Sequence, residues 1–346
     1  MDWVPHFHYD LGVSFFFVLS GFILSCTYRS FDTVGSLREF YVARIARIWP
    51  LHLLLLAAFL IVIPMDGWFP GDTAGYKTGI FFANVFLVHA WIPSVAFFFG
   101  LNAVSWSIST EAFFYLIFPM LRHKWETNWH WKSLFVFLIV ASILTITTFV
   151  DVAPINPNEP VKISNIGWGY ISPFVRMIEF VLGMLAASLY DLLSKRKLPQ
   201  GVIAWTVLEV AAIMLIVGCE RALGYSMNTA WEISSPFLAA SPLFAACIIV
   251  FAFGRGLISK CISIRPLLVL GEASFALYLS HLLLLNVLSR HLPYFESPDY
   301  VICIGFWVVA ITVALMLWKF VEKPARNKIR KIASSNRSQS SSINAV

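Results

Sequence analysis

The chain has 346 residues, of which 59% are hydrophobic and 13% are charged. Soluble domains carry about twice that charged fraction, and the apolar runs here recur from end to end. This composition excludes a soluble globular protein and predicts one polytopic membrane domain. The net charge of +6 does not call for a nucleic-acid partner, because the cytoplasmic loops of membrane proteins are commonly basic.

Apolar segments long enough to cross a bilayer are found along the whole chain. A membrane helix needs about 20 predominantly apolar residues, and the stretch "GIFFANVFLVHAW" at 79–91 is too short for that. We therefore predict an all-α fold, a polytopic transmembrane helix bundle of about nine spans with one re-entrant or short segment. The predicted spans are residues 11–28, 48–64, 103–121, 133–151, 171–191, 202–219, 236–253, 267–289 and 300–319.

The distribution of Lys and Arg predicts how these spans are oriented, because cytoplasmic loops are enriched in both residues. The basic segments are 29–47, 122–132, 195–197, 255–265 and the tail from Lys319. The segments poor in Lys and Arg are 65–78, 152–170, 220–235 and 290–299. We expect the first group in the cytoplasm, together with the C-terminus, and the second group outside.

We predict a membrane domain over residues 1–330 and a disordered cytoplasmic tail over 331–346. The tail ends in "SSNRSQSSSINAV", which is rich in Ser and has no apolar period. Five cysteines are scattered singly, and no pair of them has the spacing of a zinc or redox site. The sequence therefore predicts neither a metal site nor a bound cofactor.

The stretch "SWSISTEAFFYLIFP" at 105–119 places a carboxylate inside an apolar run. On a helix, Ser107, Glu111 and Tyr115 follow one another at i, i+4 and i+8 and share one face. A polar stripe at membrane depth must face protein or a water-filled cavity. It forms either a hydrogen-bond network that joins helices or the lining of a cavity for a polar substrate.

Arg44 and Arg47 are i, i+3 neighbours at the predicted cytoplasmic end of a span, and Pro50 follows them. One interpretation is ordinary anchoring by cytoplasmic cations. The other is phosphate binding, because two guanidinium groups at this spacing offer paired donors that suit phosphate oxygens. A phosphorylated cytoplasmic co-substrate would bind there.

Further ionisable residues lie within predicted spans. Arg176 and Glu179 are an i, i+3 pair, and we expect a structural ion pair between them. His281 lies in "GEASFALYLSHLLLL". It serves either in packing and hydrogen bonding or, less commonly for a single membrane histidine, in catalysis.

Five segments, taken together and in order, resemble the bacterial acyltransferase 3 family of integral membrane proteins, and the closing "FVEKPARNKI" at 320–329 fits as well. The resemblance extends from residue 11 to about residue 330. The segments are "LGVSFFFVLSGFIL" (11–24), "FYVARIARIWPLHLL" (41–54), "SWSISTEAFFYLIFP" (105–119), "RMIEFVLGM" (176–184) and "SFALYLSHLLLL" (274–285).

This resemblance implies an O-acyltransferase of the bacterial inner membrane with ten core helices. Such proteins move an acyl group, often acetyl, from cytoplasmic acyl-CoA to a hydroxyl of a sugar, glycan or lipid-linked saccharide. The partners implied are acyl-CoA as co-substrate, a carbohydrate or lipid-linked acceptor, and membrane lipids. By similarity, Arg44 and Arg47 hold the CoA phosphates. The acceptor path is lined by Trp106, Ser107, Ser109, Glu111 and Tyr115.

One departure from the family pattern concerns the catalytic base. Members normally begin with a further helix, upstream of the motif at 11–24, that has an Arg and then a His taken as the general base. His6 and His8 are not at that position, so we expect a chain truncated or wrongly started at its N-terminus and inactive or weakened as given. His281 is the first substitute to test. A transporter or flippase using the same cavity, and a non-catalytic remnant, remain the alternatives.

Overall fold

The computed structural model describes residues 11–69, 73, 75–156, 158–222, 228–291, 300–329 and 331. The described residues form helices and no strand, which confirms the all-α prediction. His6, His8 and the segment 332–346 lie outside the described residues. In chain order the helices are α1 Leu11–Thr27, α2 Val34–Val62, η1 Met65–Gly67, α3 Lys77–Val85, η2 His89–Trp91, α4 Val95–Phe98, η3 Ala103–Ser105, α5 Trp106–Arg122, α6 Trp125–Phe149, η4 Gly167–Ile171, α7 Pro173–Ser194, α8 Val202–Ala222, α9 Ala230–Ala252, α10 Leu257–Ile262, α11 Arg265–His291, α12 Tyr300–Leu317 and η6 Trp318–Glu322.

Eight helices in the described ranges are long and apolar enough to cross a membrane, and α1 is a shorter apolar helix of 17 residues. Together they correspond to the nine predicted spans. The segment predicted to be short overlaps α3, whose 9 residues extend about 14 Å along the helix axis. That length is well below the roughly 30 Å of a bilayer core.

The second predicted span, 48–64, was placed too late in the chain. Helix α2 begins at Val34, after Thr33, whose hydroxyl accepts a hydrogen bond from the Ser36 N–H in a reciprocal cap. The first half of α2 contains charged residues. The start of the helix is therefore not part of an apolar run, and hydropathy alone does not predict it. As a result, Arg44 and Arg47 lie inside the helix and not at its end.

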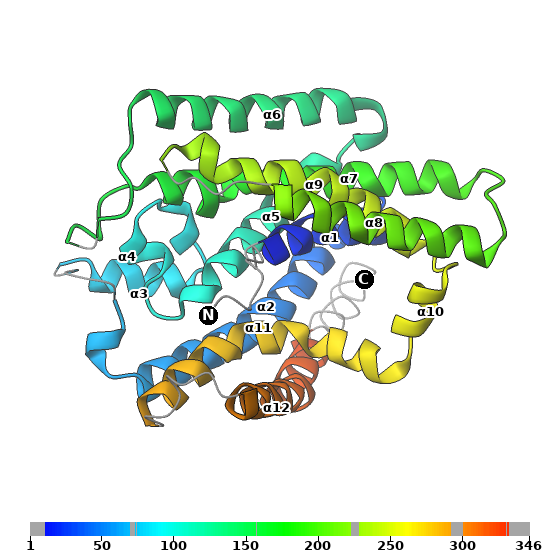
Figure 1. Cartoon of the computed structure of the whole chain (residues 1–346). Helices are drawn as coiled ribbons and strands as arrows, with labels where there is room; N and C mark the ends of the chain where they lie inside the picture. Colours follow the sequence, from blue (N-terminus) through cyan, green and yellow to red (C-terminus); the bar gives the residue numbers. More distant parts are fainter. Residues whose placement is uncertain are drawn as a thin grey trace, which may run out of the picture.

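The helices are arranged in two groups that meet at α5 (Figure 1). Helices α1, α7 and α9 pack against one another, with α6 and α8 on their outer side. In the lower part of the view, α11 packs against both α2 and α12. Helices α6, α8 and α12 expose large apolar side chains, as expected of surfaces that face lipid.

Two glycines allow α1 and α7 to approach closely. A Cβ at Gly21 of α1 would lie 2.0 Å from the Phe180 carbonyl oxygen of α7. In the opposite direction, a Cβ at Gly183 of α7 would lie 2.0 Å from the Val18 carbonyl oxygen of α1. The two backbones therefore touch without side chains between them, as small residues commonly permit in membrane bundles.

Polar contacts fix α2 relative to α5 and to the short helices. The Tyr41 hydroxyl of α2 donates to the Leu116 carbonyl oxygen of α5 at 3.0 Å. Two residues after Arg47, the Trp49 indole N–H donates to the Val85 carbonyl oxygen of α3 at 3.2 Å. These contacts on either side of Arg44 and Arg47 hold that part of α2 against the centre of the bundle.

Candidate functional site

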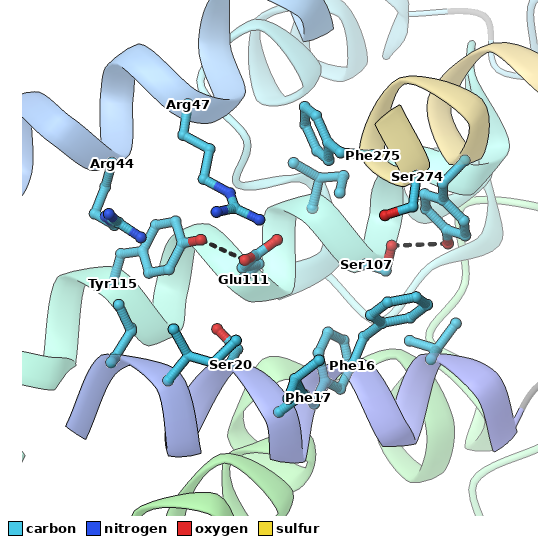
Figure 2. A pocket seen from close by; sticks show the side chains of 16 residues that line it. Phe16, Phe17, Ser20, Arg44, Arg47, Ser107, Glu111, Tyr115, Ser274 and Phe275 are labelled. Carbon is cyan, nitrogen blue, oxygen red and sulfur yellow. Dashed lines mark hydrogen bonds between the residues drawn. The ribbon is translucent and has the colours of Figure 1, made fainter. Parts of the chain in front are cut away.

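A cavity of about 130 Å³ lies between α1, α2, α5 and α11 (Figure 2). Helix α1 supplies an apolar wall, α2 the two arginines, α5 the polar stripe, and α11 the closing side. The lining residues are Val13, Phe16, Phe17, Leu19, Ser20, Ile23, Leu24, Arg44, Arg47, Ser107, Ile108, Glu111, Tyr115, Ser274, Phe275 and Tyr278.

Arg44 and Arg47 both line the cavity because their spacing places them on one face of α2. The Arg44 guanidinium lies 5.4 Å from the ring centroid of Tyr115, and its Nη2 is 3.4 Å from the Tyr28 hydroxyl. Its buried Nε has no hydrogen-bond partner. Aromatic faces therefore hold Arg44 in place while leaving donor capacity unused.

Arg47 forms no hydrogen bond or ion pair with the residues that the structure describes. Its side chain reaches from α2 toward the carboxylate of Glu111 (Figure 2). The cavity lining thus contains two guanidinium groups and one carboxylate, and the buried carboxylate of Glu322, outside the lining, also interacts electrostatically with Arg47. An anion entering the cavity would meet donors that are not already saturated by the protein.

Glu111 lies on the cavity side of α5 and is held there by its own helix. The Tyr115 hydroxyl, one turn further along, donates a hydrogen bond to Glu111 Oε1. The other carboxylate oxygen has no hydrogen bond from a described residue. The i, i+4 relationship recognised in the sequence thus produces a direct contact, and it leaves one acceptor oxygen for a ligand.

A chain of hydrogen bonds joins α5 to α11 at the other end of the stripe. The Ser107 hydroxyl donates to the Tyr278 oxygen at 2.8 Å, and the Tyr278 hydroxyl donates to the Val104 carbonyl oxygen at 3.1 Å. The two interpretations of the polar stripe, a network that joins helices and the lining of a cavity, therefore apply to different residues of it. Ser107 joins helices, whereas Glu111 presents an oxygen to the cavity.

Trp106 and Ser109 do not line the cavity. Successive helical residues are separated by about 100°, so these two side chains leave α5 in other directions. The Trp106 ring lies 5.9 Å from the Arg176 guanidinium. The Ser109 hydroxyl donates to the Leu87 carbonyl oxygen at 2.7 Å and accepts from the Ala90 N–H at 3.2 Å. Both fix α5 in the bundle.

The predicted ion pair between Arg176 and Glu179 is present, with Nε and Oε2 3.1 Å apart and both side chains fully buried. Arg176 Nη2 donates to Ser14 Oγ at 3.1 Å, and the Ser241 hydroxyl lies 3.2 Å from Glu179 Oε1. The Phe237 ring is 4.1 Å from the guanidinium carbon. This fully buried group joins α1, α7 and α9.

His281 does not line the cavity either. Its Nδ1 is 2.6 Å from the Tyr278 carbonyl oxygen in the preceding turn of α11. That contact is the local hydrogen bonding expected of a packed membrane histidine.

Sequence reasoning missed the contributions of α11 and of Ser20 to the cavity. Ser274 and Tyr278 are i, i+4 neighbours, as Ser107 and Glu111 are, so both helices present polar side chains at the same spacing. The i, i+4 spacing of polar residues on both helices was the sequence pattern that could have indicated the contribution of α11. The pairing of Ser107 with Tyr278 joins residues 171 positions apart, and no local pattern indicates it.

The comparisons with known proteins decide the family. The family profile described as "Acyltransferase domain" matches residues 1–317. The chain belongs to this acyltransferase family. Acyltransferase MdmB of Streptomyces mycarofaciens is 30% identical over 295 residues, which cover 80% of this chain and 68% of the relative.

A second relative, O-acetyltransferase OatA of Staphylococcus aureus (strain NCTC 8325 / PS 47), is 23% identical over 337 residues, or 92% of this chain and 53% of the relative. The chain therefore spans about half the length of OatA. No solved structure gives a significant match. Family membership favours acyl transfer over the transporter alternative for the cavity between α2 and α5.

Proposed function

We propose that this acyltransferase moves an acyl group, acetyl in the simplest case, from acyl-CoA to a hydroxyl of a sugar, glycan or lipid-linked saccharide. The observation that supports this most directly is the cavity itself. It combines Arg44 and Arg47, which have unused donors, with Glu111, which has an unused acceptor oxygen. Anion-binding groups and a group able to bind a hydroxyl therefore share one cavity.

The donor end of the site is formed by the arginine pair. The phosphates of acyl-CoA are the anions that these two arginines would bind, because guanidinium groups form paired, charge-assisted hydrogen bonds with phosphate oxygens. The basic segments of the sequence predict that this end faces the cytoplasm, where acyl-CoA is found. We assign the protein to a bacterial inner membrane with its C-terminus on the same side.

The acceptor end is formed by Glu111 and the residues around Ser107. The acceptor hydroxyl donates a hydrogen bond to the free Glu111 oxygen, and its own oxygen attacks the thioester carbonyl carbon. A carbon–oxygen bond forms, the carbon–sulfur bond breaks, and CoA leaves as its thiol with the proton that the hydroxyl has lost. Among the described residues lining the cavity, Glu111 is the carboxylate able to pass that proton on, and Tyr115 holds it in position.

The test is transfer from radiolabelled acetyl-CoA in membranes that contain the chain. We expect label in the glycan or lipid-saccharide fraction, with release of one CoA thiol for each acetyl group transferred. Arg47→Met should abolish both signals. Arg38→Met is the matched control, because Arg38 lies on the same helix, is exposed and does not line the cavity. Transfer that persists in Arg47→Met would contradict the proposal.

A further inference from the structure

A second cavity, of about 300 Å³, lies beyond the C-terminal end of α2. Six of the eight side chains that line it are apolar, and three of these are aromatic. The two polar residues both begin α3. The lining residues are Leu60, Met65, Trp68, Phe69, Lys77, Thr78, Phe81 and Leu101.

The aromatic wall of this cavity is held in place by backbone contacts. The Trp68 indole N–H donates to the Ile63 carbonyl oxygen at 2.6 Å. The Trp68 carbonyl oxygen in turn accepts from the Leu101 N–H at 2.7 Å. Leu101 adopts a positive φ of 62°, a conformation that non-glycine residues rarely adopt. These hydrogen bonds therefore hold the aromatic wall of the cavity in a defined conformation.

Two cations at this end of the molecule form no ion pair with a residue that the structure describes. Lys77 lines the cavity and is exposed. Arg290 lies beside the wall, since a Cβ at Gly67 would be 2.6 Å from its Nη2. Neither forms an ion pair or a hydrogen bond with another described residue. Lys162, by contrast, lies 2.6 Å from Glu159 and lowers the pKa of that carboxyl through their hydrogen bond.

The second cavity lies across the bundle from the arginine pair. Leu60 follows Arg47 by 13 positions on α2, which is about 20 Å along the helix axis. Leu101 precedes Val104 by three residues, and the Val104 carbonyl accepts from the Tyr278 hydroxyl of the first cavity. The short segment from Leu101 to Val104 therefore connects the wall of the second cavity with the hydrogen bonds beside the first.

We propose that the second cavity binds the lipid-phosphate part of the acceptor. The phosphate lies between Lys77 and Arg290, and the hydrocarbon chain lies against the ring of Trp68 and its apolar neighbours. The predicted orientation places this end outside, where the sequence otherwise provides few cations. Two cations there without an ion pair among the described residues favour an anionic ligand. This assignment rests on the proposed function, because it gives the acceptor a binding site separate from that of acyl-CoA.

The test is photo-crosslinking in nanodiscs with a polyprenyl phosphate that has a diazirine in its first isoprene units. Polyprenol with the same diazirine is the uncharged control, and a water-soluble sugar phosphate is the competitor. The variants are Lys77→Met, Lys77→Arg, and Lys162→Met as the matched surface control. Binding of acetyl-CoA to each variant is measured alongside.

We expect the phosphate probe to label peptides containing Trp68, Phe69 or Phe81 at least about tenfold more than polyprenol, the size of one charge-assisted contact. Lys77→Met should remove this difference, Lys77→Arg should restore it, and Lys162→Met should leave it unchanged. Acetyl-CoA binding should be the same throughout.

Equal labelling by the two probes, labelling confined to other peptides, or full competition by the sugar phosphate would each overturn the assignment. Because crosslinking needs no turnover, the assignment is tested separately from the proposed function. Phosphate-dependent labelling of a chain that transfers no acetyl group would uphold the lipid site and refute the acyl transfer.

Discussion

The bundle contains two groups in which arginine and a carboxylate meet at membrane depth. In one, Arg176 and Glu179 are fully buried and 3.1 Å apart, and Ser14 and Ser241 provide further contacts. In the other, Arg44, Arg47 and Glu111 line a cavity. The first group is neutral overall and has aromatic rings packed around it. The second borders a cavity, and its arginine side chains are among the cavity's lining. Buried donor atoms without a hydrogen bond occur in both groups, Arg176 Nε and Nη1 in the first and Arg44 Nε in the second.

This difference separates structural from ligand-binding charges. A closed, neutral pair that is fully buried stabilises the contacts of the helices around it. An open group whose side chains line a cavity keeps part of its interaction energy for a molecule that enters. The i, i+3 spacing is the same for Arg44 and Arg47 as for Arg176 and Glu179, so the surroundings and not the motif decide the role.

The largest expected effect follows from breaking the closed pair. Arg176→Met leaves Glu179 buried without a partner, and we expect a loss of about 3–5 kcal/mol in unfolding free energy. The measurement is thermal unfolding in detergent. Arg176→Met combined with Glu179→Leu should be less destabilising than Arg176→Met alone. A double variant that is as unstable as the sum of the two single ones would show that the two charges do not compensate each other.

A smaller effect is expected at the open group from Arg47→Lys. The charge remains, but the planar fork that binds two phosphate oxygens is lost. Loss of one charge-assisted hydrogen bond, about 1.5–3 kcal/mol, corresponds to a rise of roughly 10- to 100-fold in KM for acetyl-CoA. The unfolding temperature should not change. A fall in stability with unchanged KM would mean that Arg47, like Arg176, has a structural role and does not bind acetyl-CoA.

Tyr115→Phe tests the support of the carboxylate. The substitution removes the hydroxyl that donates to Glu111 Oε1 and leaves the ring over Arg44 in place. We expect kcat to fall by about fivefold to tenfold, the value of one ordinary hydrogen bond, with little change in KM for acetyl-CoA. A rise in that KM without a change in kcat would instead assign Tyr115 to the donor end.

The smallest effect is expected from Tyr278→Phe, which removes a contact between α5 and α11. The Val104 carbonyl and the Ser107 hydroxyl each lose their contact with the Tyr278 hydroxyl, and only the 3.2 Å contact between the two remains. We expect a loss of about 0.5–1.5 kcal/mol in stability. The check is denaturant unfolding, with Tyr300→Phe as the control because that tyrosine is exposed. Equal effects of the two variants would contradict a joining role for Tyr278.

Much of the fold was predictable because membrane helices leave a strong signal in hydropathy. Nine helices and one short segment follow from apolar length alone. The start of α2 was not predictable in this way, since its first turns contain charges that lie outside an apolar window. Helix capping by Thr33 and Ser36 was the better signal there, and it is a local pattern that the sequence does display.

The candidate site was predictable where it depends on one helix. The shared face of Ser107, Glu111 and Tyr115 follows from helical spacing, and so does the pairing of Arg176 with Glu179. The position of α11 opposite α5 depends on packing between distant segments, so Tyr278 could not be placed. For the same reason Trp106 and Ser109 were grouped with the cavity, although helical rotation directs them away from it.

The backbone contact at Gly21 and Gly183 decides which side of the cavity can yield to a substrate. A volume of about 130 Å³ is far smaller than acyl-CoA, so entry requires one wall to move. Helices α1 and α7 meet backbone to backbone, with no rotamer between them that could change to make room. Helices α2 and α11 border the cavity through arginines, serines and a tyrosine, whose side chains can rearrange. The wall formed by α1 therefore stays in place when a substrate enters, and the walls formed by α2 and α11 are the ones that move.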